Sequence, residues 1–92
     1  NSSEDDAFAK IIGYTPQAMT AIAWLKNEMP YEVHEKEHEK LLVVEGSCDI
    51  IMSNNIITLF PGDFYAIPLN AGHTIKITSS IPCKVILQRS AA

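Results

Sequence analysis

The residues best suited to chemistry are imidazoles and carboxylates that gather in two short segments of the chain. The first segment contains Glu32, His34, His38 and Glu39, and the second contains His73. Imidazole nitrogens and carboxylate oxygens are the ligand atoms that zinc and related divalent ions accept. These residue types therefore favour metal binding, provided that the fold brings them together.

Alternation along extended backbone predicts which of these side chains face the interior. Glu39 shares a face with Leu41 and Val43, and His73 shares a face with Ile75. If the aliphatic residues face the core, Glu39 and His73 point inward with them. Both polar side chains then lie among apolar neighbours, which is costly unless each finds a partner.

The first segment supplies further ligand atoms for the same interior position. Glu32 and His34 are two residues apart, so their side chains share one face of an extended segment. The sequence predicts a divalent ion at His34, Glu39 and His73, with Glu32 as a weaker fourth ligand. The alternative is an empty site that holds water and a hydrogen-bonded histidine cluster.

The ligand types also indicate which ion to expect. Glu32 and Glu39 together would neutralise a dication, and oxygen and imidazole ligands suit hard or borderline metals better than thiolate-seeking ones. We expect zinc first, with manganese, iron or nickel as alternatives.

A rival motif overlaps the first segment. Residues 34–38 read His-Glu-x-x-His, a pattern that places two zinc ligands on one face of a helix in metalloproteases. Val33 and Val43 flank it with β-branched residues, and a protease needs a longer chain to build its cleft. We therefore favour a connecting turn, with His38 near the metal site as an outer-shell residue or as a solvated turn histidine.

Length and charge limit the classes of protein. Ninety-two residues suit one domain, predicted to span residues 1–92 with residues 1–6 as a frayed tail. The net charge is −4 and the seven Lys and Arg residues are scattered, so nucleic acid is not expected as a direct partner. No apolar run approaches the roughly 20 residues that span a bilayer, so no membrane partner is expected either.

The expected redox state of the two cysteines indicates the cellular compartment of the protein. Cys48 and Cys83 form no disulfide framework, so they are expected as reduced core residues, with a single bridge as the alternative. Reduced thiols favour a cytoplasmic protein.

The positioning elements are predicted to be strands. Turn signals recur every eight to ten residues, which predicts seven to nine short strands and an all-β sandwich or barrel. Residues 17–26 are rich in Ala and also fit a helix, but the strand-like remainder of the chain favours a strand there. The predicted strands cover residues 7–12, 17–26, 31–34, 41–44, 48–52, 56–60, 64–68, 73–78 and 83–89.

The two segments together resemble the signature motifs of the cupin family. His34, Glu39 and Gly46 fit the spacing of the first motif, and Glu32 stands where that motif has its first histidine. The second motif matches at the three positions Gly62, Pro68 and His73, whereas Asn70 replaces a glycine and Ile77 replaces a terminal asparagine. The resemblance implies a double-stranded β-helix, or jelly-roll, cupin barrel.

Three functions remain open, because cupin barrels host unrelated roles. Residues 33–50, 68–73 and 83–89 are similar to the cupin half of zinc-binding anti-sigma factors, which implies a sensory or regulatory module for a small-molecule ligand or signal. A sigma factor would then be held through a domain that this chain lacks. The resemblance also implies a homodimer, which the apolar strand at residues 83–87 supports.

The alternatives are an enzyme and a metal-free binding barrel. A stand-alone cupin enzyme of the dioxygenase, isomerase or decarboxylase type would use the ion and His38 as an outer acid or base; enzymatic activity is left uncertain, with the balance against it. A metal-free barrel would bind an apolar ligand against its lining. The predicted lining residues are Leu41, Val43, Phe64 and Ile75.

Overall fold

Eight antiparallel strands and no helix make up the computed structural model, which describes residues 7–92. The predicted tail at residues 1–6 lies outside the described residues. The strands are β1 (Ala7–Tyr14), β2 (Ala18–Leu25), β3 (Glu37–Glu45), β4 (Cys48–Met52), β5 (Ile56–Leu59), β6 (Phe64–Ile67), β7 (His73–Ile77) and β8 (Cys83–Ala91).

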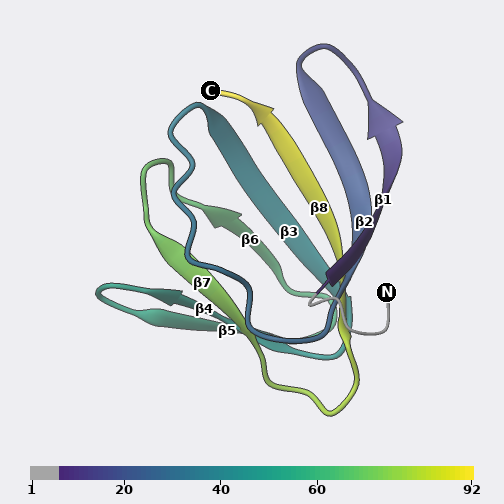
Figure 1. Ribbon diagram of the computed structural model, residues 1–92, viewed down its shortest axis with the longest axis vertical. Helices are drawn as coiled ribbons and strands as arrows, with labels where there is room; N and C mark the ends of the chain where they lie inside the picture. Colours follow the sequence, from purple (N-terminus) through teal and green to yellow (C-terminus); the bar gives the residue numbers. More distant parts are fainter. Residues whose placement is uncertain (1–6) are drawn as a thin grey trace.

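The strands form two sheets that enclose the core. One has five strands in the order β1-β2-β8-β3-β6, and the other has three in the order β5-β4-β7 (Figure 1). From β3 onward the chain crosses from one sheet to the other at β3–β4, β5–β6, β6–β7 and β7–β8, as in a jelly roll. The predicted all-β, double-stranded β-helix is therefore confirmed. Within residues 7–92, no segment forms a helix able to cross a membrane.

Period-two alternation builds the core from the inner faces of both sheets. On β3, Leu41 and Val43 are each 1% exposed, and Leu42 between them is less buried and faces outward. The three-stranded sheet contributes Ile50 and Cys48, and β8 contributes Cys83. Both cysteines are free and fully buried, as the first of the two sequence interpretations expected.

Residues 17–26 form a strand because they have partners on both sides. Ile22 of β2 pairs with Lys10 of β1 and with Ile86 of β8, so the segment lies inside the five-stranded sheet. This tertiary pairing outweighs the helix propensity of its alanines. β1 runs two residues further than predicted, and the turn to β2 is closed at Thr15, whose hydroxyl accepts a hydrogen bond from the Ala18 backbone nitrogen at 3.0 Å.

Candidate metal centre

The loop before β3 carries Glu32 and His34 and is held against the start of β7. The backbones of Glu32 and His73 exchange two hydrogen bonds of 2.9 Å, and the Asn70 nitrogen donates to the His34 carbonyl oxygen at 2.8 Å. Side chains of such a paired couple project on the same side of the backbone. The loop therefore brings Glu32 and His34 to His73, although His73 is far from both in sequence.

Asn70 shows how the chain keeps a motif geometry with a different residue. It is the one non-glycine residue with positive φ in the described part of the chain, at 66°. Asparagine reaches this left-handed region at lower cost than most residues do. The replacement of the motif glycine by Asn70 therefore preserves the bend that holds His34.

Four side chains converge between the sheets. The Glu39 Oε1 atom lies 2.6 Å from His34 Nε2 and 3.6 Å from His73 Nε2. One ligand atom from each of Glu32, His34 and His73 also lies within 4.8 Å of the others. Glu39 and His73 are almost fully buried, at 4% and 1% exposed, so these groups meet inside the barrel.

The facing atoms lack well-formed hydrogen bonds. His34 Nε2, Glu39 Oε1 and His73 Nε2 are buried, and although they lie within ion-pair distance of one another, none of them makes a hydrogen bond of good geometry. Tetrahedral ligand atoms at about 2.0–2.2 Å from one zinc ion lie roughly 3.3–3.6 Å apart, which the 3.6 Å separation matches and the 2.6 Å separation approaches. His73 is further oriented by its Nδ1 atom, which lies 3.1 Å from the Ala71 carbonyl oxygen. These residues fit a divalent metal ion, which would satisfy atoms that protein partners leave unsatisfied.

The charged groups around Glu39 favour its ionised form, which is the form that can bind a metal ion. Burial by itself raises the pKa of Glu39, but His73, Arg89 and His34 together outweigh burial and hold that pKa below its usual value. The pKa of His73 is raised, chiefly by the Glu39 carboxylate, with burial acting in the opposite direction. Glu39 is therefore ionised at neutral pH, whereas an incoming ion competes with a proton at His73.

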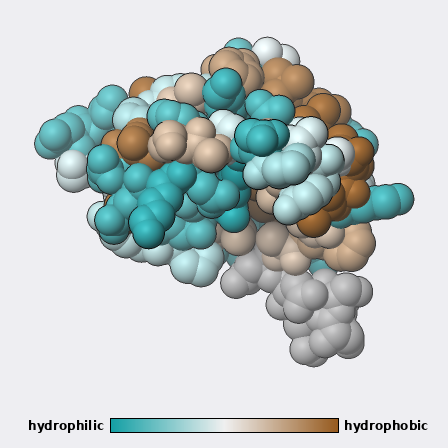
Figure 2. Space-filling model, turned by 90° about the horizontal axis from the view of Figure 1, so that it is seen from above, coloured by the Kyte–Doolittle hydropathy of each residue, from teal (hydrophilic) through white to brown (hydrophobic). Residues whose placement is uncertain are grey.

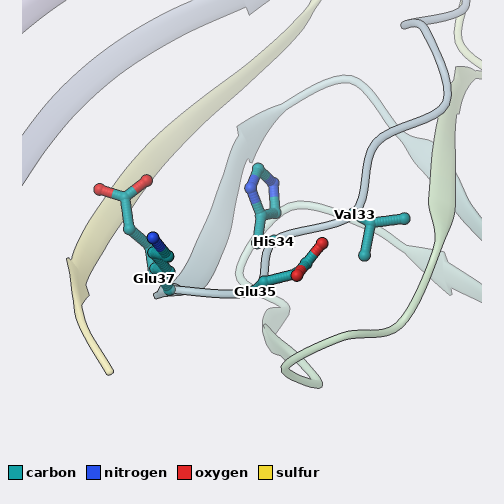
Figure 3. Close-up of a pocket in the computed structure, with 5 residues that line it drawn as sticks. Val33, His34, Glu35 and Glu37 are labelled. Atoms are coloured by element: carbon teal, nitrogen blue, oxygen red, sulfur yellow. The ribbon is translucent and has the colours of Figure 1, made fainter.

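Two hollows adjoin the metal centre. An open depression of about 350 Å³ lies over residues 33–37, and Figure 3 shows the His34 ring standing between the strands while Val33 and Glu35 point away from it. A more enclosed chamber of about 70 Å³ reaches Glu39 from the inside. Most of its lining is apolar, so the centre has a polar end and an apolar end.

The four residues predicted to line a ligand pocket lie in different parts of the structure. Leu41 and Ile75 line the inner chamber, whereas Val43 lies further along β3 in the packed core. The prediction for Phe64 is wrong: this residue is 61% exposed and pairs with Leu42 on the outer face of the sheet. The sequence did not reveal which of the two alternating sets of side chains on the edge strand β6 faces the core.

Of the two roles left open for His38, an outer-shell residue or a solvated turn histidine, the structure contradicts the outer-shell role. His38 lies within β3 rather than in a turn, and it is exposed. Because neighbouring residues of a strand face opposite sides, His38 points away from the face that carries Glu39. The His-Glu-x-x-His spacing consequently forms no helical zinc motif.

Arg89 is a site residue that the sequence analysis did not single out. It pairs with Glu39 across β8 and β3, and its Nε atom lies 3.5 Å from Glu39 Oε2. The available signal was the alternation of Cys83, Val85 and Leu87, which continues inward to Arg89.

The fold and the centre define a small jelly-roll domain with a candidate Glu/His/His metal site. A family model described as "Cupin domain" matches residues 25–88, so the chain belongs to the cupin family. No curated protein matches the sequence at a significant level.

Solved structures show the same fold. A cupin-2 domain protein from Shewanella frigidimarina is 22% identical with a TM-score of 0.81, over 90% of this chain and 79% of that one. KdgF from Halomonas sp. is 20% identical with a TM-score of 0.81, over 95% and 82%. The Cnp3 cupin domain of Schizosaccharomyces pombe is only 8% identical but has a TM-score of 0.87, over 97% and 67%.

Proposed function

We propose that this chain is a metal-binding cupin module that uses a bound divalent ion to bind a small-molecule ligand. His34, Glu39 and His73 would hold the ion, with Glu32 as the fourth ligand, and zinc is the first expectation. When bound, the ion supplies a Lewis acid to an oxygen atom of the ligand. The observation that carries the proposal is a set of buried ligand atoms that face one another at close range without hydrogen bonds of good geometry.

The finer proposal is a sensory or regulatory role of the anti-sigma-factor kind. Its support is the similarity of residues 33–50, 68–73 and 83–89 to the cupin half of those proteins. In this role, the ligand would bind at the metal centre and a sigma factor would be held by another domain. Its test is whether the ligand is bound and released without chemical change.

A metal-dependent enzyme is the second candidate, and the open depression beside His34 favours it. A catalytic ion needs a coordination position that substrate can reach from solvent, and the depression of about 350 Å³ provides access. The two roles differ in one observable. Nuclear magnetic resonance of a bound small molecule shows an unchanged spectrum for a sensor and new product signals for an enzyme.

The first prediction concerns the ligands. His34→Ala is expected to abolish stoichiometric metal binding, because it removes one of three central ligand atoms, while the β-sheet circular dichroism spectrum survives. His38→Ala is the matched control, since it removes an exposed imidazole four residues away. Metal content is measured by inductively coupled plasma mass spectrometry after anaerobic purification without added metal.

The outcomes separate the alternatives. About one equivalent of metal in the native protein and in the His38 variant, but none in the His34 variant, is the expected result. Full metal retention in the His34 variant contradicts the proposed site. If the native protein neither contains nor takes up metal, the metal-free ligand-binding barrel replaces the proposal.

We also propose a homodimer formed through the outer face of the five-stranded sheet. Lys10, Ile22, Ile86, Leu42 and Phe64 lie side by side in one row across its five strands. An outer sheet face in contact with water normally carries polar residues, whereas four members of this row are apolar. Figure 2 shows hydrophobic residues gathered on the side of the molecule where β1 and β2 lie.

A further inference from the structure

Arg89 carries a charge at the metal centre that no described hydrogen bond satisfies. Its Nε atom is buried without a hydrogen-bond partner, and the 3.5 Å to Glu39 Oε2 is an ion-pair distance. Guanidinium groups present several donors in a planar fork that matches a carboxylate in two-point contact. Glu39 occupies only one side of this fork, so Arg89 retains donors for a further anion.

The position of Arg89 suits a ligand-binding group. It lines the inner chamber of about 70 Å³ beside the metal centre. It also lines a cleft of about 180 Å³ between the β1–β2 turn and residues 36–37. Its side chain is 31% exposed. Arg89 is therefore reached by solvent on one side and borders, on the other, the chamber that also contacts Glu39.

The charges of the loaded centre favour an anion. A divalent ion is balanced by the two carboxylates of Glu32 and Glu39. With Arg89 included, the loaded centre then keeps one net positive charge, in a region where solvent screens charges only in part. This step rests on the proposed metal site. A ligand with one negative charge would bring the whole centre to neutrality.

The chamber limits the rest of the ligand. Its walls include the apolar side chains of Leu25, Leu41, Ile75 and Val85, and its volume suits only a few heavy atoms. We propose that Arg89 binds the carboxylate of a small monocarboxylic acid whose short apolar chain occupies this chamber. Arg89 is thus a specificity-determining residue that selects an anionic ligand over a neutral one of the same shape.

The test uses butyrate and its neutral counterpart butyramide as probes. Both are titrated by isothermal calorimetry into the metal-loaded protein, and the metal content of every sample is measured separately. We expect butyrate to bind and butyramide to bind at least about tenfold more weakly. Arg89→Gln should weaken butyrate binding by about 10- to 100-fold, the range for a charged hydrogen bond, and leave the metal content unchanged.

Two variants serve as controls. Lys76→Gln removes one positive charge from an exposed position on β7, so it should leave butyrate binding unchanged if net charge alone is not the cause. Arg89→Lys keeps the charge but loses the planar fork, and it should give intermediate affinity. It also keeps the proposal testable if Arg89→Gln does not fold.

The results that overturn this inference differ from those that overturn the metal site. Equal affinity for butyrate and butyramide, no measurable butyrate binding, or native affinity in both Arg89 variants would each exclude the carboxylate-binding role. A native protein that neither contains nor takes up metal would instead exclude the proposed metal site. The same titrations on metal-free protein would then decide whether Arg89 binds butyrate by itself.

Discussion

At the scale of single residues, Glu32 is a proposed metal ligand at which this chain departs from the cupin motif. It stands at the position of the first histidine in the cupin motif, yet its side chain lies with His34 and His73 in one ligand group. A carboxylate ligand brings a negative charge that an imidazole lacks. Glu32 therefore lowers the net charge of a loaded centre and favours harder ions.

The second prediction follows from this difference. Glu32→Ala should lower zinc affinity by about tenfold or more but keep one site per chain, because His34, Glu39 and His73 remain. Glu32→His should restore binding and shift preference toward nickel and zinc over manganese, since imidazole suits these ions better. Competition titration with a chelating dye measures both effects. Unchanged affinity in the alanine variant would show that Glu32 is not a ligand.

At the scale of elements, the turn between β3 and β4 fixes how the two sheets meet. Gly46 has φ of 76°, and a Cβ atom there would come within 2.8 Å of the Pro82 carbonyl oxygen and 3.0 Å of the Cys83 Cα atom. Glycine is required for both reasons, the left-handed backbone and the close approach of another chain segment. This turn links the strand of Glu39 to the three-stranded sheet.

The third prediction separates these two reasons. Gly46→Ala should destabilise the fold by about 2–4 kcal/mol, through backbone strain and the collision with backbone atoms. Gly62→Ala is the matched control, because Gly62 also has positive φ, of 92°, but nothing lies within 4 Å of its added Cβ. Its cost should be about 1 kcal/mol. Urea unfolding measures both, and equal midpoints would contradict the packing argument.

At the scale of the whole molecule, the two outer sheet faces differ in polarity. The three-stranded sheet presents polar contacts such as the hydrogen bond of 2.7 Å that Thr58 donates to Asp49. The five-stranded sheet presents the apolar row through Ile86 and Leu42 instead. A chain of this size buries only about 60–70% of its unfolded surface, so a second copy on the apolar face would add stability.

The fourth prediction tests this surface. Ile86→Glu should convert the dimer to a monomer, because a charge would be buried at its centre. Ile56→Glu, the same change at a residue 59% exposed on the other sheet, should leave the dimer intact. Light scattering after size exclusion measures the molar mass. A monomeric native protein, or a dimeric Ile86 variant, would contradict the proposed interface.

The sequence by itself determined the strand content and the inward direction of the core residues. Alternation requires no knowledge of partners, so Glu39, Leu41 and His73 were correctly predicted to face inward. It could not decide the phase of a short edge strand, which is why Phe64 was misplaced. Nor could it place His38 in β3, because the start of that strand depends on pairing with β8.

Only the tertiary structure decided which inward groups meet. The backbone pairing of Glu32 with His73 and the cross-strand position of Arg89 beside Glu39 arise from contacts between distant segments. Local periodicity reports the face on which a side chain lies, but not its neighbour from another strand. The residues suited to metal binding could thus be identified in the sequence. That Arg89 is the cationic partner of Glu39 could be identified only from the pairing of β8 with β3.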